Sequence, residues 1–417
     1  MSDAAGSGFH DPLAIAYSSG TDNRHDGGDV DKDKVERIKA AFERDQREDR
    51  PAVNPGDIPY RYEAITPEWM THILCKDHPE AKVVSVSLDE ADSGTSNRRR
   101  VFVDYNEAGQ RLGLPKSVFC KATVDLANRL LLSTSALLSE TTFYNQIRPQ
   151  LDIEAPEAYL AVYDPESFAS IVMLKDIGDS VSFCSHKTQM TLDRVKDQMG
   201  VLAALHGHFY RSPQLDTTLG HMFRYDERFL ALDRDHDFKG MCEAGLREAH
   251  RAAPDVVPER LFAREAEVWP ATVKASARHG ALPLTITHGD VHLKNWYITN
   301  EGRMGLSDWQ VTSKGHWSRD VAYTISTALT VEQRRAWEQD LLRIYLDAFA
   351  AAGGEAVSFD EAWLNYRQQL LTTLAWWTMT LTPGKDVPDM QPRDITVEFI
   401  RRIAVAIDDL DALDSIG

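Results

Sequence analysis

Strand-like segments, in which apolar residues alternate with polar ones or form short apolar runs, dominate the chain between residues 82 and 176. They cover residues 84–88, 101–105, 117–121, 159–163 and 170–174. Side chains of a β-strand point alternately to opposite faces, so this pattern predicts strands with one face on a core. Turn-forming residues connect the first three strands, and a helical stretch at about 135–150 precedes the fourth. We therefore predict a small α+β unit with a five-stranded antiparallel sheet and one helix.

Beyond residue 176, apolar residues recur every three or four positions, which is typical of amphipathic helices. Predicted helices cover residues 190–210, 330–352, 358–382 and 394–410. Thr330 with Gln333, and Ser358 with Glu361, have the spacing of a capping box at a helix N-terminus. The predicted fold is therefore of the α+β class and bilobal, with a small sheet-containing lobe and a large, mostly helical lobe. A cleft between two such lobes is the expected place for a ligand.

Residues 1–57 precede the predicted sheet and are mostly polar. Within them, four apolar residues recur at helical spacing: Val35, Ile38, Ala41 and Phe42. We expect one amphipathic helix here, lying across the main body, and a mobile chain in the rest of this extension. The expected division is an N-terminal extension at 1–57, a small lobe at 58–176 and a helical lobe at 177–417.

Composition limits the classes of function. Hydrophobic residues make up 43% and charged residues 26%, and no apolar run reaches the roughly 18 residues that a membrane-spanning helix needs. The formal net charge of −18 disfavours nucleic acid and anionic membranes as partners. The N-terminus has no secretory signal pattern, and the four cysteines form no CxxC pair. We expect a cytoplasmic protein with reduced thiols and without an obligate protein partner.

The most informative segment for chemistry is 287–308, THGDVHLKNWYITNEGRMGLSD. It contains two short strand-like runs separated by a turn centred on Glu301, which predicts a hairpin. In such a hairpin Asn295 lies opposite the residue that precedes Asp308, and Asp290 lies on the loop that enters the same end. We therefore predict that the side chains of Asp290, Asn295 and Asp308 converge.

Oxygen ligands of this kind suit Mg²⁺, and a further carboxylate can accept a proton from an alcohol. Kinases require an Asp, an Asn five positions later and then a metal-binding Asp, which matches Asp290, Asn295 and Asp308. Lys121, at the end of the third strand, can reach nucleotide phosphates, and Glu140 on the next helix can form an ion pair with it. The combination predicts phosphoryl transfer from ATP.

A second phosphate contact is predicted at the turn of residues 92–97, which contains Ser93, Gly94 and Thr95. Backbone N–H groups of such turns bind phosphate, although the turn has only one glycine. The three arginines at 98–100 that follow it are interpreted as solvated charge, because neighbouring side chains of a strand point to opposite faces.

Several motifs occur in the order of a known superfamily. PKSVFCKAT, SETTFYNQI, VMLKDIGD, LAALHGHFY, HGDVHLKN, LSDWQ and RDVAY follow one another along the chain. Over residues 60–405 the chain resembles the aminoglycoside phosphotransferase/choline kinase-like superfamily, and most closely its ecdysteroid kinase-like branch and bacterial relatives. The resemblance implies a bilobal, protein-kinase-like fold and transfer of the ATP γ-phosphate to a hydroxyl of a small molecule.

The resemblance also implies roles for individual residues. Asp290 would be the catalytic base, and Asn295 and Asp308 would bind Mg²⁺. Lys121 would contact the ATP phosphates, and Glu140 would orient Lys121.

Further roles follow from the same resemblance. Leu174 and Asp176 would contact the nucleotide at the hinge between the lobes. Asp320 would brace the catalytic loop, of which His288 would be a structural member. Gln310 stands where classical aminoglycoside kinases often have an acid, which weakens that substrate assignment.

Alternative functions remain open at this point. The acidic net charge favours an aminoglycoside or other antibiotic-inactivating kinase, and a nucleotide-binding pseudokinase with a regulatory role is a candidate of another class. His288 and His292, with Asp290 between them, also permit a metal hydrolase, although they leave Asn295 unexplained. His206, on the apolar face of its helix, is interpreted as a core histidine.

Five tryptophans lie in or near the segments discussed above: Trp296, Trp309, Trp363, Trp376 and Trp377. Most are expected to pack in the helical core. If one or two of them face the cleft, the acceptor is expected to be an apolar or ring-containing alcohol.

Overall fold

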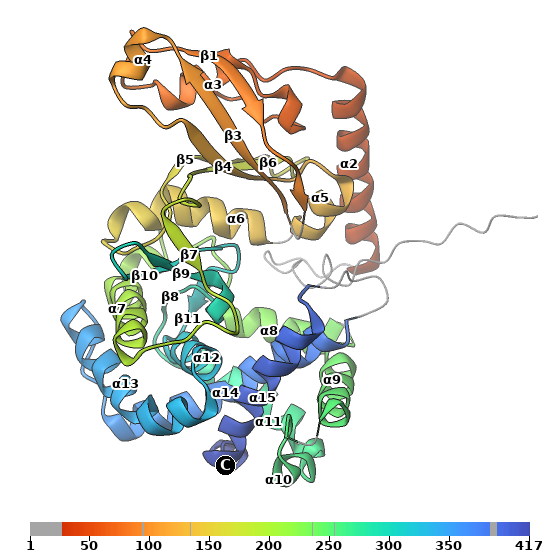
Figure 1. The fold of residues 1–417 in the computed structure, drawn as a ribbon. Coiled ribbons are helices and arrows are strands. Elements are labelled where there is room, and N and C mark those ends of the chain that lie inside the picture. The colour runs from red at the N-terminus through yellow and green to blue at the C-terminus, as the bar shows by residue number, and fades with distance from the viewer. Residues whose placement is uncertain (1–26, 94–95, 134, 236, 254, 384–389) are drawn as a thin grey trace, which may run out of the picture.

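The computed structural model has two lobes with a cleft between them (Figure 1). It describes residues 27–93, 96–133, 135–235, 237–253, 255–383 and 390–417. The part of the predicted mobile extension up to residue 26 lies outside the described residues. Gly94 and Thr95 of the predicted phosphate turn also lie outside them.

The small lobe is built on the predicted antiparallel sheet, with the strand order β1-β3-β4-β6-β5. Its strands are β1 (Val83–Leu88), β3 (Asn97–Tyr105), β4 (Ser117–Ala122), β5 (Ala158–Tyr163) and β6 (Ser170–Lys175). A two-residue strand, β2 (Asp92–Ser93), pairs with β3 in addition. The prediction of five antiparallel strands is therefore confirmed.

Helices flank this sheet. They are α2 (Gly27–Glu48), α3 (Pro67–Leu74), α4 (Glu107–Arg111), α5 (Leu126–Leu132) and α6 (Ser135–Thr142), with a single 3₁₀ turn at Tyr62–Ala64. The predicted helix at 135–150 is present, but it changes from α6 to a π-helix at Phe143–Ile147 and to a 3₁₀ turn at Arg148–Gln150. The link between β3 and β4 contains α4 in addition to a turn, because the Asn106 side chain accepts a hydrogen bond from Gly109 and caps a short helix.

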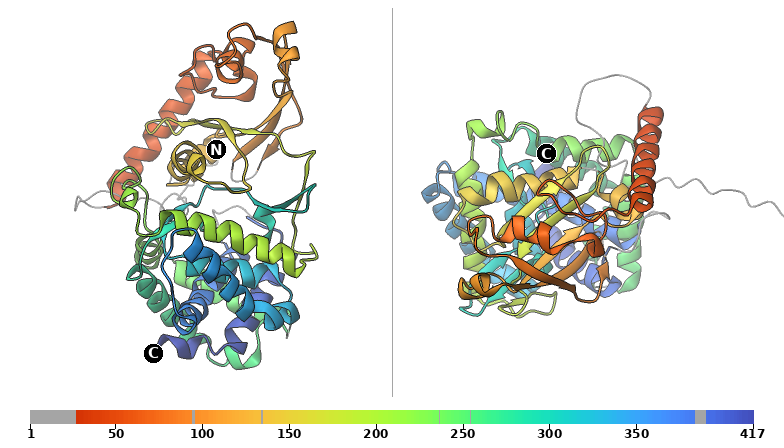
Figure 2. Two further views of the ribbon diagram at one scale, coloured as in Figure 1. Left: turned by 90° about the vertical axis from the view of Figure 1, so that its left-hand side faces the viewer. Right: turned by 90° about the horizontal axis from the view of Figure 1, so that it is seen from above.

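The predicted amphipathic helix of the extension is α2, which runs along the side of the small lobe (Figure 2). Ile38 and Ala41 are buried. Asp45 forms an ion pair of 2.7 Å with Arg129 of α5, whose side chain is fully buried. Because a buried arginine needs a charged partner, this pair fixes α2 to the lobe.

Alternation along β4 and β6 gives the sheet two different faces. Cys120 and Met173 face a cluster that includes Trp69 of α3, whereas Val172 and Leu174 join the large core. Lys121 and Cys120 are neighbours and therefore point to opposite faces. The sheet thus directs Lys121 away from the small core and into the cleft.

The large lobe is mostly helical and is described over the following helices: α7 (Leu192–Phe209), α8 (Tyr225–Asp235), α9 (Phe238–Ala252), α10 (Glu259–Phe262), α11 (Glu265–Gly280), α12 (Ser318–Ala328), α13 (Val331–Ala351), α14 (Phe359–Leu381) and α15 (Arg393–Asp409), with 3₁₀ turns at Pro213–Leu215 and Leu413–Ile416. The capping box of Thr330 and Gln333 is confirmed. At α14 the Ser358 side chain accepts a hydrogen bond from the Glu361 N–H. No helix in the described ranges is long and apolar enough to cross a membrane.

The large lobe contains two small sheets, one of which carries the predicted hairpin as β9 (Trp296–Thr299) and β10 (Met304–Leu306). β7 (Val181–Phe183) completes this sheet, and β8 (Thr285–Thr287) and β11 (Ser313–Gly315) form the other. The predicted register is confirmed, because Leu306 pairs with Trp296 and the Ser307 N–H donates to the Asn295 carbonyl at 2.8 Å.

Candidate active site

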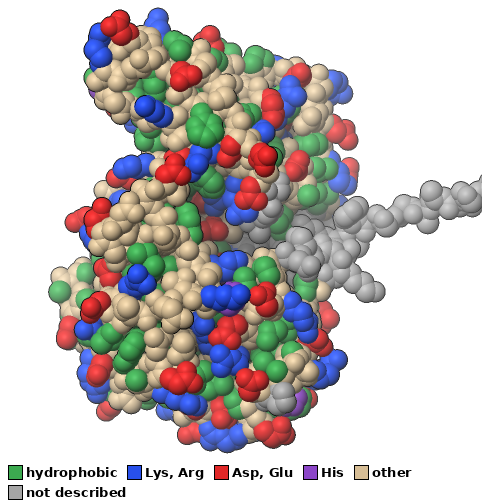
Figure 3. Space-filling view, viewed as in Figure 1, with side chains coloured by type: hydrophobic (Ala, Val, Ile, Leu, Met, Phe, Trp, Pro, Cys, Tyr) green, Lys and Arg blue, Asp and Glu red, His purple; other side chains and the backbone are tan. Residues whose placement is uncertain are grey.

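Two cavities lie between the lobes. The surface of the molecule is also indented between the lobes (Figure 3). The sheet-side cavity has a volume of about 550 Å³, and its walls include Phe119, Lys121, Glu140, Leu174 and Asp176. The helix-side cavity has a volume of about 420 Å³, and its walls include Leu132, Asp290, Tyr323, Trp376 and Trp377. Four residues line both cavities: Arg98, Lys294, Asn295 and Asp308.

Lys121 is the central cation of the sheet-side cavity. Its Nζ lies 2.6 Å from Glu140 Oε1 and 2.9 Å from Asp308 Oδ1. Burial by itself would lower the pKa of Lys121, but the carboxylates of Asp308 and Glu140 outweigh it and raise the pKa. Lys121 is therefore charged at neutral pH, and it connects the small lobe to the hairpin of the large lobe.

Asp320, a fully buried residue of α12, holds the loop at 288–295 in place. The Asp320 carboxylate accepts hydrogen bonds from the backbone N–H groups of His288 at 2.7 Å and Gly289 at 3.1 Å, and it contacts His206 Nε2 at 3.3 Å. Gly289 has φ +84°, and a Cβ there would lie 2.6 Å from the Val311 carbonyl oxygen. Only glycine fits this position, so the sharp turn before Asp290 is fixed by the sequence.

His288 locks the same loop from the other side. Its Nε2 donates to the Ser307 carbonyl at 3.0 Å, and its Nδ1 accepts the Asp290 N–H at 3.1 Å. One nitrogen donates and the other accepts, which requires a neutral ring, and burial lowers the pKa of His288 accordingly. His288 thus ties the Asp290 backbone to the residue before Asp308.

Asp290 points into the helix-side cavity with its carboxylate partly exposed. Its Oδ1 accepts the Tyr323 hydroxyl at 3.0 Å, and its Oδ2 lies 3.3 Å from Asn295 Nδ2 and 3.4 Å from His292 Nε2. Burial favours the protonated acid, but His292 and the hydrogen bonds from His292 and Tyr323 lower the pKa of Asp290. The carboxylate is therefore ionised and oriented.

Asn295 and Asp308 lie side by side at the end of the hairpin, as the sequence predicts. The Asn295 amide nitrogen donates to the Asp290 carbonyl at 2.7 Å, so its amide oxygen points away from that loop. Asp308 adopts φ +66°, a backbone conformation rare for residues other than glycine. Such conformations concentrate at functional sites, where surrounding structure maintains them.

The donors at this position fit a hard divalent cation. When Mg²⁺ binds with a nucleotide, phosphates and waters supply most of its ligands and the protein supplies few. One amide oxygen and one carboxylate match the number and type that the protein supplies. Across the described residues, no group of three or more His, Cys, Asp or Glu has the arrangement of a metal site. His288 uses both ring nitrogens in the loop, so the donors of a histidine-based metal hydrolase are not assembled by the described residues.

The hinge residues and the arginines form a network at the rim of the sheet-side cavity. Asp176 accepts hydrogen bonds from Ser117 Oγ at 2.6 Å, and its carboxylate lies 2.6 Å from Arg100 Nε. Leu174 lines the same cavity with a buried side chain. All three arginines at 98–100 line this cavity. The interpretation of these residues as solvated charge is wrong for Arg100, which pairs with Asp176, whereas the Arg98 side chain is 40% exposed. Ser93 lies in β2 next to the undescribed Gly94 and Thr95.

The tryptophans divide between core and cavity. Trp296 and Trp309 are fully buried; Trp309 stacks on Phe143 with 3.6 Å between ring centroids. Trp376 and Trp377 of α14 instead line the helix-side cavity, together with Tyr323. The prediction of a core histidine is confirmed for His206, which is fully buried and bonded to Tyr345 and Asp320.

Sequence reasoning missed most of the helix-side cavity. Leu132 comes from α5, Tyr323 from α12, and Gln391 from the segment before α15. Lys294 was visible inside the motif HLKN, but nothing in the pattern indicated that it faces two cavities. The position of Tyr323, one helical turn beyond Arg319-Asp320, was the best available signal, because residues three or four apart share a helix face.

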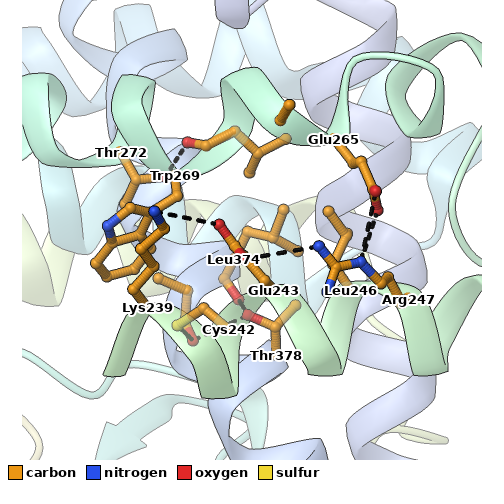
Figure 4. Close-up of a pocket in the computed structure, with 13 residues that line it drawn as sticks. Lys239, Cys242, Glu243, Leu246, Arg247, Glu265, Trp269, Thr272, Leu374 and Thr378 are labelled. Atoms are coloured by element: carbon orange, nitrogen blue, oxygen red, sulfur yellow. Dashed lines mark hydrogen bonds and ion pairs between the residues drawn. The ribbon is translucent and has the colours of Figure 1, made fainter. Parts of the chain in front are cut away.

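A third pocket, of about 230 Å³, lies within the large lobe between α9, α11 and α14 (Figure 4). Its rim carries four charged residues: Lys239, Glu243, Arg247 and Glu265. These charges pair with one another, for example Arg247 Nε with Glu265 at 3.2 Å. None of Asp290, Asn295 and Asp308 lines this pocket.

Comparison with known proteins gives a family. Residues 136–358 match the family described as "Phosphotransferase enzyme family" (APH). No curated protein matches the chain.

Among solved structures, the choline kinase LicA from Streptococcus pneumoniae is 14% identical, covers 82% of this chain and 97% of its own, and has a TM-score of 0.42. An ethanolamine kinase from Plasmodium vivax is 12% identical, covers 89% of this chain and 94% of its own, and has a TM-score of 0.46. A microcompartment-associated aminopropanol kinase is 15% identical, covers 84% and 98%, and has a TM-score of 0.48.

Proposed function

The chain belongs to the phosphotransferase enzyme family, and from this premise we propose that it transfers the γ-phosphate of ATP, with Mg²⁺, to a hydroxyl group of a small molecule. The family match supports a phosphotransferase. The identity of the co-substrate, the metal and the acceptor is the proposed part, as is the role of each residue below.

One observation carries the proposal. Lys121 lines only the sheet-side cavity, Asp290 lines only the helix-side cavity, and Asn295 and Asp308 line both. A phosphoryl group in transit between two ligands needs a cation on the donor side, a base on the acceptor side and metal ligands between them. The order of these residues across the cleft matches that requirement.

In the proposed mechanism ATP occupies the sheet-side cavity, where Lys121 contacts its phosphates and Glu140 keeps Lys121 in place. Asn295 and Asp308 would hold Mg²⁺, which supplies charge compensation for the phosphates when bound. The acceptor hydroxyl lies beside Asp290 in the helix-side cavity. Its oxygen forms the new bond to Pγ while the bond from Pγ to the β-phosphate oxygen breaks, its proton passes to the Asp290 carboxylate, and ADP leaves.

The walls of the helix-side cavity favour an apolar or ring-containing alcohol as acceptor. The rings of Tyr323, Trp376 and Trp377 line it, and Trp376 is the partly exposed one of the three. Asp290 and Asp308 are the only acids among the described lining residues, and both are assigned to catalysis. A polycationic aminoglycoside would need further carboxylates, so that acceptor is less well supported by the described wall.

The test is ADP formation by the purified protein with Mg·ATP across a panel of hydroxylated compounds. The panel spans aminoglycosides, macrolides, choline-like alcohols, sterols and phenols. We expect turnover with a ring-containing alcohol that disappears in Asp290→Asn and persists in Asp340→Asn, a control at an exposed aspartate of α13. Mg·ATP binding without turnover on any class would favour a pseudokinase with a binding role.

A further inference from the structure

The wall that the two cavities share holds two cations whose place in the proposed reaction is not yet assigned, Arg98 and Lys294. From their position we infer that the acceptor carries an anionic group, such as a carboxylate, which binds to Lys294 with support from Arg98. This inference rests on the proposed function, because it concerns the acceptor of the same site.

Lys294 points to the acceptor side of the shared wall. Its Nζ donates a hydrogen bond to Gln391 Oε1. Gln391 and the following Pro392 line the helix-side cavity but not the sheet-side one. The ammonium group is therefore positioned where an acceptor lies, on the same loop as Asp290 and four positions beyond it.

Arg98 approaches this ammonium group from the small lobe. Its Nη2 lies 3.0 Å from Asp92 Oδ2, while its Nε is buried and has no hydrogen-bond partner among the described residues. Asp394, at the start of α15, acts on Lys294 from a distance and does not line either cavity. A ligand carboxylate between Arg98 and Lys294 would accept from both cations, and two such charge-assisted bonds would fix its orientation.

The rest of the wall agrees with an anionic ring compound. A third cation, Arg319, also lines the helix-side cavity, but it is held by the Gly289 carbonyl and the Tyr225 and Tyr323 rings and lies 3.8 Å from the Asp320 carboxylate. In the proposed reaction the two acids of the described wall are already assigned: Asp308 to the metal at the γ-phosphate and Asp290 to the acceptor hydroxyl. Asp92 compensates Arg98 and Asp320 compensates Arg319, so a cationic acceptor would meet chiefly the ammonium group of Lys294. No unassigned acid lies among the described lining residues of the cavity, so like-charge repulsion disfavours such an acceptor.

An anionic acceptor explains Lys294 better than a contact with ATP does. In the proposed reaction the sheet-side cavity already contains Lys121 for the phosphates. Lys294 is bonded to the opposite side, at Gln391. The experiment must still separate the two, because a residue that binds Pγ would affect every acceptor equally.

The test uses three matched probes that differ only in one end group: para-(hydroxymethyl)benzoate, its carboxamide and para-(hydroxymethyl)benzylamine. Dissociation constants are measured by ligand-observed NMR with Mg²⁺ and a non-hydrolysable ATP analogue at saturation, so that the sheet-side cavity is filled. We expect the benzoate to bind about tenfold more tightly than the carboxamide, and the amine to bind most weakly.

Variants test whether Lys294 and Arg98 cause the preference for the benzoate. Lys294→Gln and Arg98→Gln should each reduce the preference for the benzoate, and Lys294→Arg should retain most of it. Lys239→Gln, at an exposed lysine on the rim of the third pocket, is the matched control and should leave it unchanged. Thermal unfolding of each variant checks that it is folded.

Tighter binding of the amine than of the benzoate would overturn the inference, as would a preference that survives in Lys294→Gln. Equal weakening of all three probes together with weaker binding of the ATP analogue would also overturn it, since Lys294 would then contact ATP. Failure of the proposed function is a separate result: no hydroxyl compound would give ADP formation that depends on Asp290, whatever the order of the three affinities.

Discussion

The two cavities of the cleft differ in how they are built. The sheet-side cavity is connected by charge: Lys121 contacts Glu140 and Asp308, and Arg100 contacts Asp176. The helix-side cavity combines aromatic and aliphatic side chains with polar and charged ones. Among its described lining residues, Asp290 is the acid that does not also line the sheet-side cavity.

A charged network requires particular partners at particular distances, whereas an apolar wall tolerates changes of shape. We therefore propose that the sheet-side cavity performs a fixed task and that the apolar part of the helix-side cavity selects the acceptor. The shared wall of Asn295 and Asp308 is where the two tasks meet.

Metal removal should have the largest effect, because it acts on both cavities at once. A chelator is expected to reduce turnover to background, since Asn295 and Asp308 would have no ion through which to hold the phosphates. Titration with Mg²⁺ should restore the rate, and calorimetry should show weaker ATP binding without the metal. Full activity after exhaustive chelation would contradict the role of the shared wall.

Asp290→Asn should impair the helix-side cavity and leave the sheet-side cavity unaffected. We expect kcat to fall by about 10²–10⁴, because the base is lost, and ATP affinity to stay unchanged, because Asp290 lines only the helix-side cavity. Rapid-quench kinetics and ATP titration measure the two quantities. A comparable loss of ATP affinity would show that the cavities are not independent.

Lys121→Met should impair the sheet-side cavity and leave the helix-side cavity unaffected. Loss of a charge-assisted phosphate contact is expected to lower kcat/KM for ATP about 10- to 100-fold, with little change in acceptor binding. Lys116→Met, at an exposed lysine just before β4, is the control. An effect confined to the acceptor would contradict the assignment of Lys121.

Trp376→Ala should have the smallest effect and only on acceptor selection. The loss of aromatic surface is expected to raise the acceptor KM by less than about tenfold, while KM for ATP remains the same. Trp363→Ala, on the same helix but outside the lining of the cavity, is the matched control. Equal effects of the two variants would mean that Trp376 acts through packing of α14.

Local sequence patterns predicted those parts of the candidate site that residues close together in the chain form. The hairpin register placed Asn295 beside Asp308, and strand alternation with a following helix placed Lys121 near Glu140. These contacts depend on short-range geometry and on motifs with fixed spacing.

The remainder depends on tertiary packing, which a pattern does not encode. The interpretation of Arg100 as solvated missed its partner Asp176, which follows β6 and is far from Arg100 in the chain. The helix-side cavity combines α5, α12, α14 and the segment before α15. The ecdysteroid kinase-like branch and the cytoplasmic location stay predictions, since the family match concerns the broader family.

Strand β6 has a consequence for how the protein melts. Its consecutive residues Ile171 to Leu174 are all buried, and they alternate between the core of the small lobe and the core that fills the large lobe. Neither lobe can lose its packing without exposing part of the other, so we expect one cooperative unfolding transition for both. A ligand bound anywhere in the cleft would then protect the whole chain against heat, and calorimetry would report it as a single shifted peak.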